Sequence, residues 1–132
     1  MPSLRTVIAD DHEEFRKILR RILEEKTECV VVGEALNGPQ AVQQTETLQP
    51  DVVVLDLALP QLNGIEVAKR IRRLSLVCKI IFLSQDHSLE IVQGALRIGA
   101  LGYLLKSDAN QLPEAVNAAM KGTVFVSSRL KT

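Results

Sequence analysis

The sequence VVVLDLALPQLNG, residues 52–64, decides the fold of this chain. It begins as an unbroken apolar run, Val52 to Leu55, which is typical of a β-strand buried on both faces of a sheet. The run ends at the carboxylate Asp56, and a loop with Pro60 and Gly64 leads into a helical pattern. In alternating strand–helix proteins, ligands bind at the carboxyl ends of the strands, so Asp56 is a candidate site residue. Taken alone, this Asp is equally well explained as a turn residue.

The segments on either side repeat the same alternation of strand and helix. Short apolar runs predict strands at residues 6–9, 30–35, 52–55, 80–83 and 102–105. Apolar residues at three-and-four spacing predict helices at residues 13–26, 41–48, 65–74, 89–98 and 112–120, with a connection at 75–79. This alternation implies an α/β fold in which helices cover both faces of a parallel sheet through right-handed crossovers.

The composition indicates one ordinary globular domain. The chain has 132 residues, of which 46% are hydrophobic and 24% charged. Sixteen basic residues balance sixteen acidic ones, which argues against a global nucleic-acid-binding surface. No apolar run is long enough to span a membrane, and the N-terminus does not look like a signal peptide. The cysteines, Cys29 and Cys78, suit no metal motif, so we expect a reduced, cytoplasmic protein in which they pack.

Polar side chains of a few specific types follow the predicted strands. Asp10 and Asp11 end the first strand, Asp56 the third, Ser84 the fourth and Lys106 the fifth. In a parallel sheet these ends lie on one edge, so the carboxylates, the hydroxyl and the ammonium group should converge there. Close carboxylates repel one another unless a cation intervenes, and a hard divalent ion such as Mg²⁺ is the natural partner. Such a site could hold a phosphoryl group on Asp56.

The same residues, in this order and spacing, resemble the receiver domain of bacterial two-component response regulators. The resemblance rests on Asp10, Asp11, Asp56, Pro60, Gly64, Ser84, Tyr103 and Lys106. It covers nearly the whole chain, and its strength lies in the set rather than in any single motif. It implies a flavodoxin-like, doubly wound (βα)5 fold with a five-stranded parallel sheet in the order 2-1-3-4-5.

The resemblance also implies a role for each site residue. Asp56 is expected to accept a phosphoryl group from a sensor histidine kinase. Mg²⁺ is expected to bind Asp10, Asp11, Asp56 and the backbone carbonyl of Ala58. Lys106 is expected to pair with the phosphoryl oxygens. On this interpretation the domain is not an enzyme, and it assists only its own phosphorylation and dephosphorylation.

Two further residues are expected to act as a switch. Ser84 would donate its hydroxyl to the phosphate, and Tyr103 would turn inward on activation. Three positions depart from the family pattern. Lys106 is followed by Ser107 where many members have Pro, so a cis peptide there is in doubt. Gln85 replaces a small residue and could crowd the phosphate entrance, and Ala58 has no side chain that could shape access.

The subgroup that the chain resembles is the NarL/FixJ (LuxR-type) one. The cues are the sequences GYLLK at residues 102–106 and KGTVFVSS at residues 121–128. We therefore expect a receiver domain at residues 1–122 and the start of a linker at 123–132, leading to a helix-turn-helix DNA-binding domain absent from this chain. The expected output is transcription regulation, with DNA contacted only through that effector domain. A homodimer is a further expectation, through the first and last helices or through the fourth.

Three alternatives compete with this interpretation. A phosphatase of the haloacid dehalogenase type needs a second Asp two residues after the first, where this chain has Ala58. A flavodoxin needs a phosphate-cradling loop, but the loop at residues 10–14 is acidic. A receiver-like interaction module that is never phosphorylated remains a weaker alternative. His12 and His87 have no paired ligand in the sequence, and both are expected at the surface.

Overall fold

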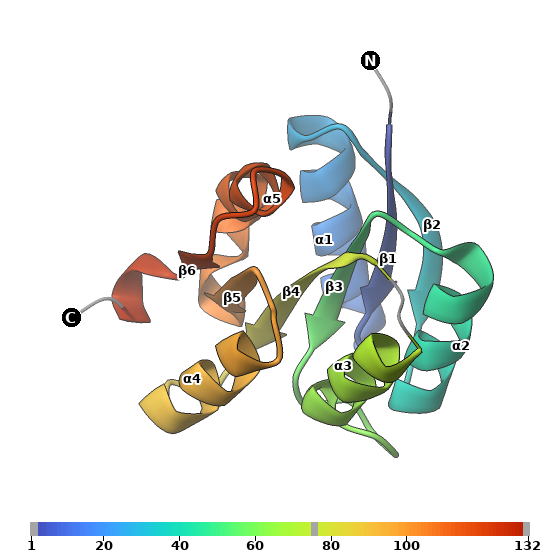
Figure 1. Cartoon of the computed structure of the whole chain (residues 1–132). Coiled ribbons are helices and arrows are strands. Elements are labelled where there is room, and N and C mark those ends of the chain that lie inside the picture. Colours follow the sequence, from blue (N-terminus) through green and yellow to red (C-terminus); the bar gives the residue numbers. More distant parts are fainter. Residues whose placement is uncertain (1–2, 75–76, 131–132) are drawn as a thin grey trace.

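A parallel β-sheet of six strands forms the centre of the computed structural model, which describes residues 3–74 and 77–130. The strands are β1 (Leu4–Ala9), β2 (Cys29–Ala35), β3 (Val52–Asp56), β4 (Lys79–Ser84), β5 (Gly102–Leu105) and β6 (Phe125–Val126). Their order is β2-β1-β3-β4-β5-β6, and every neighbouring pair runs parallel (Figure 1). The predicted α/β fold and the order 2-1-3-4-5 are therefore confirmed.

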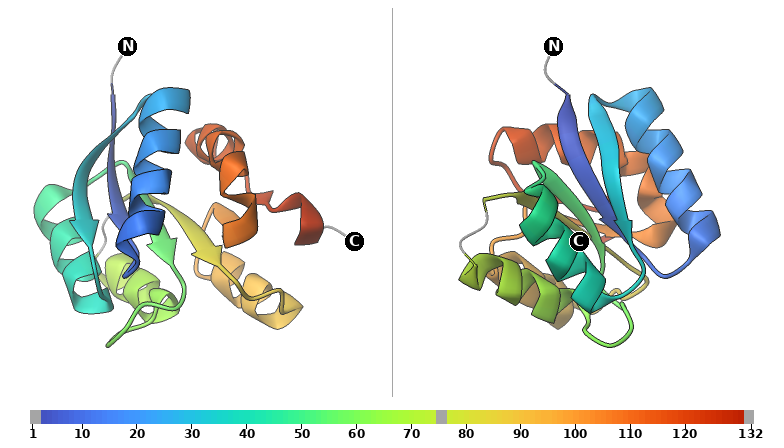
Figure 2. Two further views of the ribbon diagram at one scale, coloured as in Figure 1. Left: turned by 180° about the vertical axis from the view of Figure 1, so that it is seen from behind. Right: turned by 90° about the vertical axis from the view of Figure 1, so that its right-hand side faces the viewer.

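The helices follow the strands in alternation. They are α1 (Glu13–Lys26), α2 (Gly38–Leu48), α3 (Gly64–Arg73), α4 (Leu89–Arg97) and α5 (Leu112–Met120), with short 3₁₀ turns η1 (Lys106–Gln111) and η2 (Ser128–Leu130). Helices α1 and α5 cover one face of the sheet, and α2, α3 and α4 cover the other (Figures 1 and 2). The predicted covering of both faces is thus confirmed.

The apolar run in β3 holds the two layers together. All of its residues are buried, and successive side chains point to opposite faces of the sheet. Val53 and Leu55 belong to the core beneath α2, α3 and α4, whereas Val52 and Val54 belong to the core beneath α1 and α5. This double burial fixes the register of β3, and it therefore fixes where Asp56 emerges.

Two asparagines and a glycine shape the turns beside the site. Asn37 caps α2 by accepting a hydrogen bond from the Gln40 amide, and Asn63 caps α3 by accepting one from the Glu66 amide. Gly64 packs directly on the end of β3, where a Cβ would lie 2.6 Å from the carbonyl oxygen of Asp56. Only a residue without a side chain lets α3 begin this close to the Asp56 backbone.

The expectation of a five-stranded sheet was wrong by one strand. Residues Phe125 and Val126 form β6 beside Gly102 and Tyr103 of β5. The apolar run that forms β6 is too short to predict a strand from sequence, because its pairing with β5 is a tertiary contact. Residues 123–130 lie against the domain, and the assignment of 123–132 as the start of a linker stays a prediction; residues 131–132 lie outside the described part.

Several smaller expectations can be compared with the structure. Cys29 and Cys78 are buried free thiols, as expected of packing cysteines. No peptide bond in the described residues is cis, so the Lys106–Ser107 bond is trans. The first two residues of the predicted connection 75–79, and Met1 and Pro2 at the N-terminus, lie outside the described residues. No helix within residues 3–74 and 77–130 is both long and apolar enough to cross a membrane.

Candidate functional site

The strand ends bring the predicted site residues to one edge of the sheet. Asp10 follows β1 directly, Asp56 is the last residue of β3, and Ser84 is the last residue of β4. Lys106 follows β5 as the first residue of η1. Because β1, β3, β4 and β5 are adjacent and run in the same direction, their carboxyl ends share this edge.

Lys106 joins two buried carboxylates. Its Nζ atom lies 2.8 Å from Oδ2 of Asp10 and 3.2 Å from Oδ2 of Asp56. The side chains of the two aspartates are 1% and 2% exposed, so these ion pairs are shielded from water and from salt. The same ammonium group lies over the ring of Phe15, 4.9 Å from its centroid, which adds a cation–π contact.

The burial of this cluster changes its acid–base properties. Burial raises the pKa of Asp56, although the hydrogen bond from the Ala58 amide and the charge of Lys106 oppose the rise. Burial would lower the pKa of Lys106, but its hydrogen bond to Asp10 and the charge of Asp56 outweigh that effect and raise it. Lys106 is therefore held as an ammonium ion, which compensates part of the negative charge of the cluster.

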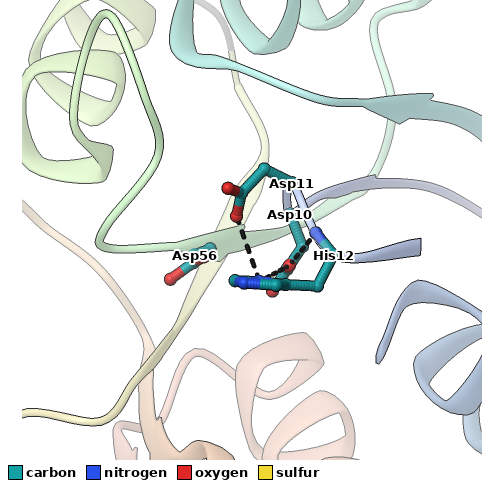
Figure 3. Close-up of side chains that lie close together, drawn as sticks. All are labelled: Asp10, Asp11, His12 and Asp56. Carbon is teal, nitrogen blue, oxygen red and sulfur yellow. Dashed lines mark hydrogen bonds and ion pairs between the residues drawn. The ribbon is translucent and has the colours of Figure 1, made fainter. Parts of the chain in front are cut away.

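Asp10 and Asp56 also belong to a larger group of acidic and histidine side chains that has the composition of a metal site. Asp10, Asp11, His12 and Asp56 each offer one ligand atom, and all of these atoms lie within 4.8 Å of one another (Figure 3). Carboxylate oxygens suit hard cations such as Mg²⁺, and one ammonium group cannot balance three carboxylates. The donor set that the structure brings together therefore fits a divalent cation.

The sequence predicts the exposure of His12 but not its contacts with acidic side chains. It lies at the surface as expected, with its side chain 67% exposed, but it does have acidic partners. Its Nδ1 atom lies 3.1 Å from Oδ1 of Asp10 and 3.1 Å from Oδ1 of Asp11 (Figure 3). The expectation that it lacks a paired group was wrong, because adjacency to the Asp10–Asp11 turn places the ring beside both carboxylates.

The loop after Asp56 holds this carboxylate in place. Oδ1 of Asp56 accepts a hydrogen bond of 3.0 Å from the backbone amide of Ala58, an Asx-type turn. The backbone amide of Leu57 donates to the carbonyl of Leu83 in β4, and that of Gly64 donates to the carbonyl of Leu57. Asp56 can therefore be both a turn residue and a site residue, since Oδ1 accepts the hydrogen bond of the turn and Oδ2 contacts Lys106.

The expected switch residues lie side by side on β4 and β5. Ser84 is 4% exposed, and its Oγ atom accepts a hydrogen bond of 2.9 Å from the Asp86 amide. Tyr103 is fully buried, its ring 6.5 Å from that of Phe82, and its hydroxyl donates to the carbonyl of Asp86 at 3.1 Å. Tyr103 therefore already has the inward position, and its movement on activation stays a prediction.

Sequence reasoning missed the supports behind the acidic residues. Nη1 of Arg16 donates to the backbone carbonyl of Asp10 at 2.8 Å, while its Nε atom pairs with Oε1 of Glu34 at 2.8 Å. Arg20 contacts the other carboxylate oxygen of Glu34 at 3.1 Å. The pattern of residues 13–26 predicts a helix with a solvated charged face, and no local pattern distinguishes a buried arginine on such a face from an exposed one.

Comparison with known proteins gives the family. The sequence profile of the response regulator receiver domain matches residues 6–117, which is most of the chain. The chain belongs to this family. Response regulator receiver domains are signalling domains that accept phosphate from histidine kinases and generally bind Mg²⁺ at an acidic cluster. In this receiver domain Asp10, Asp11 and Asp56 belong to an acidic group whose ligand atoms lie close together.

Individual relatives place this receiver domain in a subgroup. It is 36% identical over 125 residues to the nitrate/nitrite response regulator protein NarL of Escherichia coli (strain K12), covering 94% of this chain and 58% of NarL. It is 37% identical over 128 residues to the transcriptional regulatory protein LiaR of Bacillus subtilis (strain 168), covering 96% of this chain and 61% of LiaR. The chain thus spans less than two thirds of these curated relatives.

A solved structure of a LuxR-family response regulator is also similar to this chain. A two-component response regulator of the LuxR family from Aurantimonas sp. SI85-9A1 superposes with a TM-score of 0.91 at 31% sequence identity, over 98% of this chain and 93% of that chain. The predicted NarL/FixJ (LuxR-type) subgroup is therefore confirmed.

Proposed function

We propose that Asp56 of this receiver domain is the residue that accepts the phosphoryl group from a sensor histidine kinase. The observation that carries this proposal is the buried contact of Lys106 with both Asp10 and Asp56. An ammonium group held between two carboxylates at the carboxyl edge of a sheet supplies positive charge where a phosphoryl group would need it. Phosphoryl transfer depends mainly on such positioning and charge neutralisation.

In the proposed reaction a carboxylate oxygen of Asp56 attacks the phosphorus of the kinase phosphohistidine. A phosphorus–oxygen bond to Asp56 forms as the phosphorus–nitrogen bond to the histidine breaks, and the freed imidazole takes up a proton. The Ala58 amide orients one oxygen of Asp56, and Lys106 contacts the other before pairing with the phosphoryl oxygens. Ser84 donates its hydroxyl to the phosphoryl group once it is bound.

The proposed ligands of Mg²⁺ are Asp10, Asp11, Asp56 and the backbone carbonyl of Ala58. When bound there, Mg²⁺ would supply charge neutralisation and would orient the phosphoryl oxygens. The domain would assist its own phosphorylation and dephosphorylation and would have no other substrate. A phosphatase of the haloacid dehalogenase type is disfavoured, because Ala58 stands where the second acidic residue would be needed.

The proposed output concerns a longer protein than this chain. NarL is named a response regulator and LiaR a transcriptional regulatory protein, and each is longer than the matched part. By analogy we expect that phosphorylation of Asp56 controls a helix-turn-helix effector domain, and through it transcription, in the cytoplasm. Control could act by releasing the effector domain or by pairing two copies of the receiver domain.

Phosphorylation with and without Mg²⁺ tests the proposed chemistry. The chain is incubated with a small-molecule phosphodonor such as acetyl phosphate, and the product is measured by intact mass. We expect one added phosphoryl group with Mg²⁺ and almost none after chelation. Asp11→Ala should lose both the metal dependence and most of the reaction, whereas equal labelling with and without Mg²⁺ would contradict the proposed metal site.

A further inference from the structure

The proposed mechanism leaves one buried acidic side chain without a role. Asp108 lies in η1, two residues after Lys106, and its side chain is only 6% exposed. A buried carboxylate is costly unless it is paired and hydrogen-bonded. Among the described residues, Asp108 meets this requirement through the C-terminal segment, since Oδ2 accepts a hydrogen bond of 2.6 Å from Ser127 and Oδ1 lies 3.2 Å from Nε of Arg129.

Ser127 connects this carboxylate to the strand that leads to Lys106. Its side chain is fully buried, and its Oγ atom accepts a hydrogen bond of 3.1 Å from the backbone amide of Leu105. Leu105 is the last residue of β5 and directly precedes Lys106. One hydroxyl therefore satisfies a backbone amide on one side of Lys106 and a carboxylate on the other.

The same segment is also paired with the strand that carries Tyr103. The backbone amide of Ser127 donates to the carbonyl of Tyr103 at 2.9 Å, and Val126 is the register partner of Tyr103 in the sheet. Residues 125–127 thus contact β5 over most of its length, along the edge that β4 does not occupy. The C-terminal segment is a part of the sheet here.

We propose that Asp108 and Ser127 are positioning residues for Lys106. They clamp the backbone on both sides of Lys106, and so they hold its ammonium group against Asp10 and Asp56. This inference deepens the proposed function and rests on it where it concerns phosphoryl transfer. It makes the C-terminal segment a structural element of the phosphorylation site, although the segment lies outside the 6–117 match.

The coupling acts in both directions. If the position of residues 125–127 affects the phosphorylation site, then occupation of that site must affect residues 125–127 by the same free energy. A phosphoryl group that draws Lys106 toward itself pulls on the backbone that Ser127 holds. Residues 125–127 thus pair with Tyr103 and also hold the backbone beside Lys106. A movement of either Tyr103 or Lys106 would therefore act on this one segment.

Ser127→Ala removes the central hydroxyl, and Ser128→Ala is its matched control. Ser128 is the next residue, is exposed, and pairs with Gln111 outside the clamp. The first measurement is the rate of labelling by acetyl phosphate at saturating Mg²⁺, at a temperature at which circular dichroism shows both variants folded. Ser127→Ala should slow labelling by several-fold to about 100-fold, as expected for a displacement of up to about 1 Å, and Ser128→Ala should match the wild type.

The second measurement does not depend on phosphorylation. The ring of Phe15 lies over the ammonium group of Lys106, so its ring current marks the NMR signals of the Lys106 Cε–Hε group. These signals should move toward those of a free lysine in Ser127→Ala and stay in place in Ser128→Ala. Asp108→Asn should move them in the same direction as Ser127→Ala.

The outcomes separate the two claims. Unchanged Lys106 signals in Ser127→Ala and Asp108→Asn would overturn the clamp, whatever happens to the rate or to thermal stability. Moved signals with an unchanged labelling rate would overturn its role in positioning for the reaction. If the Lys106 signals move in the two variants but the wild-type protein takes up no phosphate, the clamp is supported and the proposed function is refuted.

Discussion

Lys106 is the residue on which the charge balance of the site depends. Its ammonium group is the only cation that contacts both Asp10 and Asp56 in the described part of the chain. Removing one partner from a buried ion pair leaves the other charge uncompensated, which is far more costly than losing an exposed pair. The contact therefore both stabilises the unphosphorylated cluster and keeps a positive charge ready beside Asp56.

Gln85 is expected to limit access to Asp56. Its exposed side chain lines a hollow of about 470 Å³ together with Ala58, Ser84 and His87. We predict that Gln85→Ala speeds labelling by acetyl phosphate several-fold, with a stability change within about 0.5 kcal/mol because the site is at the surface. The rate is measured by intact mass against time.

The matched control for this change is Gln93→Ala, the same substitution at an exposed position of α4 outside the hollow. It should leave the labelling rate unchanged. Identical rates for Gln85→Ala and the wild type would show that Gln85 does not obstruct the phosphodonor.

Tyr103 offers a direct optical test of the buried switch position. It is the only tyrosine, and the chain has no tryptophan, so absorbance near 295 nm reports its ionisation alone. Burial raises the pKa of Tyr103 above its ordinary value, and the charge of Asp86 adds to the rise. We predict that the folded protein titrates at higher pH than the same chain in denaturant.

The sign of the linked stability follows from this shift. Because the pKa is raised in the folded state, the stabilisation is complete below the unfolded value of about 10 and is lost as pH rises through the folded value. A folded titration midpoint at or below that of the denatured chain would mean that Tyr103 is exposed to water.

At the scale of elements, local patterns predicted the strands and helices well, because each apolar run is buried as its periodicity implies. The strand ending at Asp56 and the helix from Glu13 to Lys26 are found where their patterns place them. What local patterns could not supply were contacts between distant segments. The strand β6, the support of Asp10 by Arg16 and the pairing of Asp108 with Ser127 all depend on tertiary packing.

The start of α3 gives a prediction at this scale. A Cβ on Gly64 would lie 2.6 Å from the Asp56 carbonyl oxygen and 2.8 Å from Cα of Leu57, and both are backbone atoms that cannot move aside cheaply. We predict that Gly64→Ala destabilises the fold by about 1–3 kcal/mol and also slows phosphorylation, since it displaces Asp56. Denaturant unfolding and the labelling rate measure the two effects.

Gly94, unlike Gly64, has room for a side chain. It lies inside α4, and a Cβ there would meet no atom within 4 Å. Gly94→Ala should therefore stabilise the fold by about 1 kcal/mol through helix propensity and leave phosphorylation unchanged. Equal stability changes for the two glycines would contradict the close packing of α3 on the end of β3.

For the whole molecule, the balance of charges predicts that the chain does not bind DNA by itself. Its basic and acidic residues balance at sixteen each, and DNA binding requires clustered Lys and Arg to neutralise phosphates. We predict no DNA binding by these 132 residues at physiological salt in a gel-shift assay. Tight, sequence-specific binding would contradict the assignment of DNA contact to an effector domain.

Phosphorylation is expected to act on the molecule as a whole by changing its association. Two copies related by a two-fold axis would suit a palindromic operator. Sedimentation with beryllofluoride, a phosphate mimic, should show a larger dimer fraction than sedimentation without it. A monomer under both conditions would remove the dimer model and leave release of the effector domain as the output.

The central claim is that Asp56 carries the phosphoryl group, and mass measurement after labelling tests it most directly. The chain is treated with acetyl phosphate and Mg²⁺, and the modified residue is mapped by peptide mass. The account predicts one phosphoryl group, at Asp56, that is absent in Asp56→Asn and retained in Asp86→Asn, a change in a nearby carboxylate outside the acidic cluster. Undiminished labelling of Asp56→Asn, or a label mapped to Asp10 or Asp11 in the wild type, would contradict it.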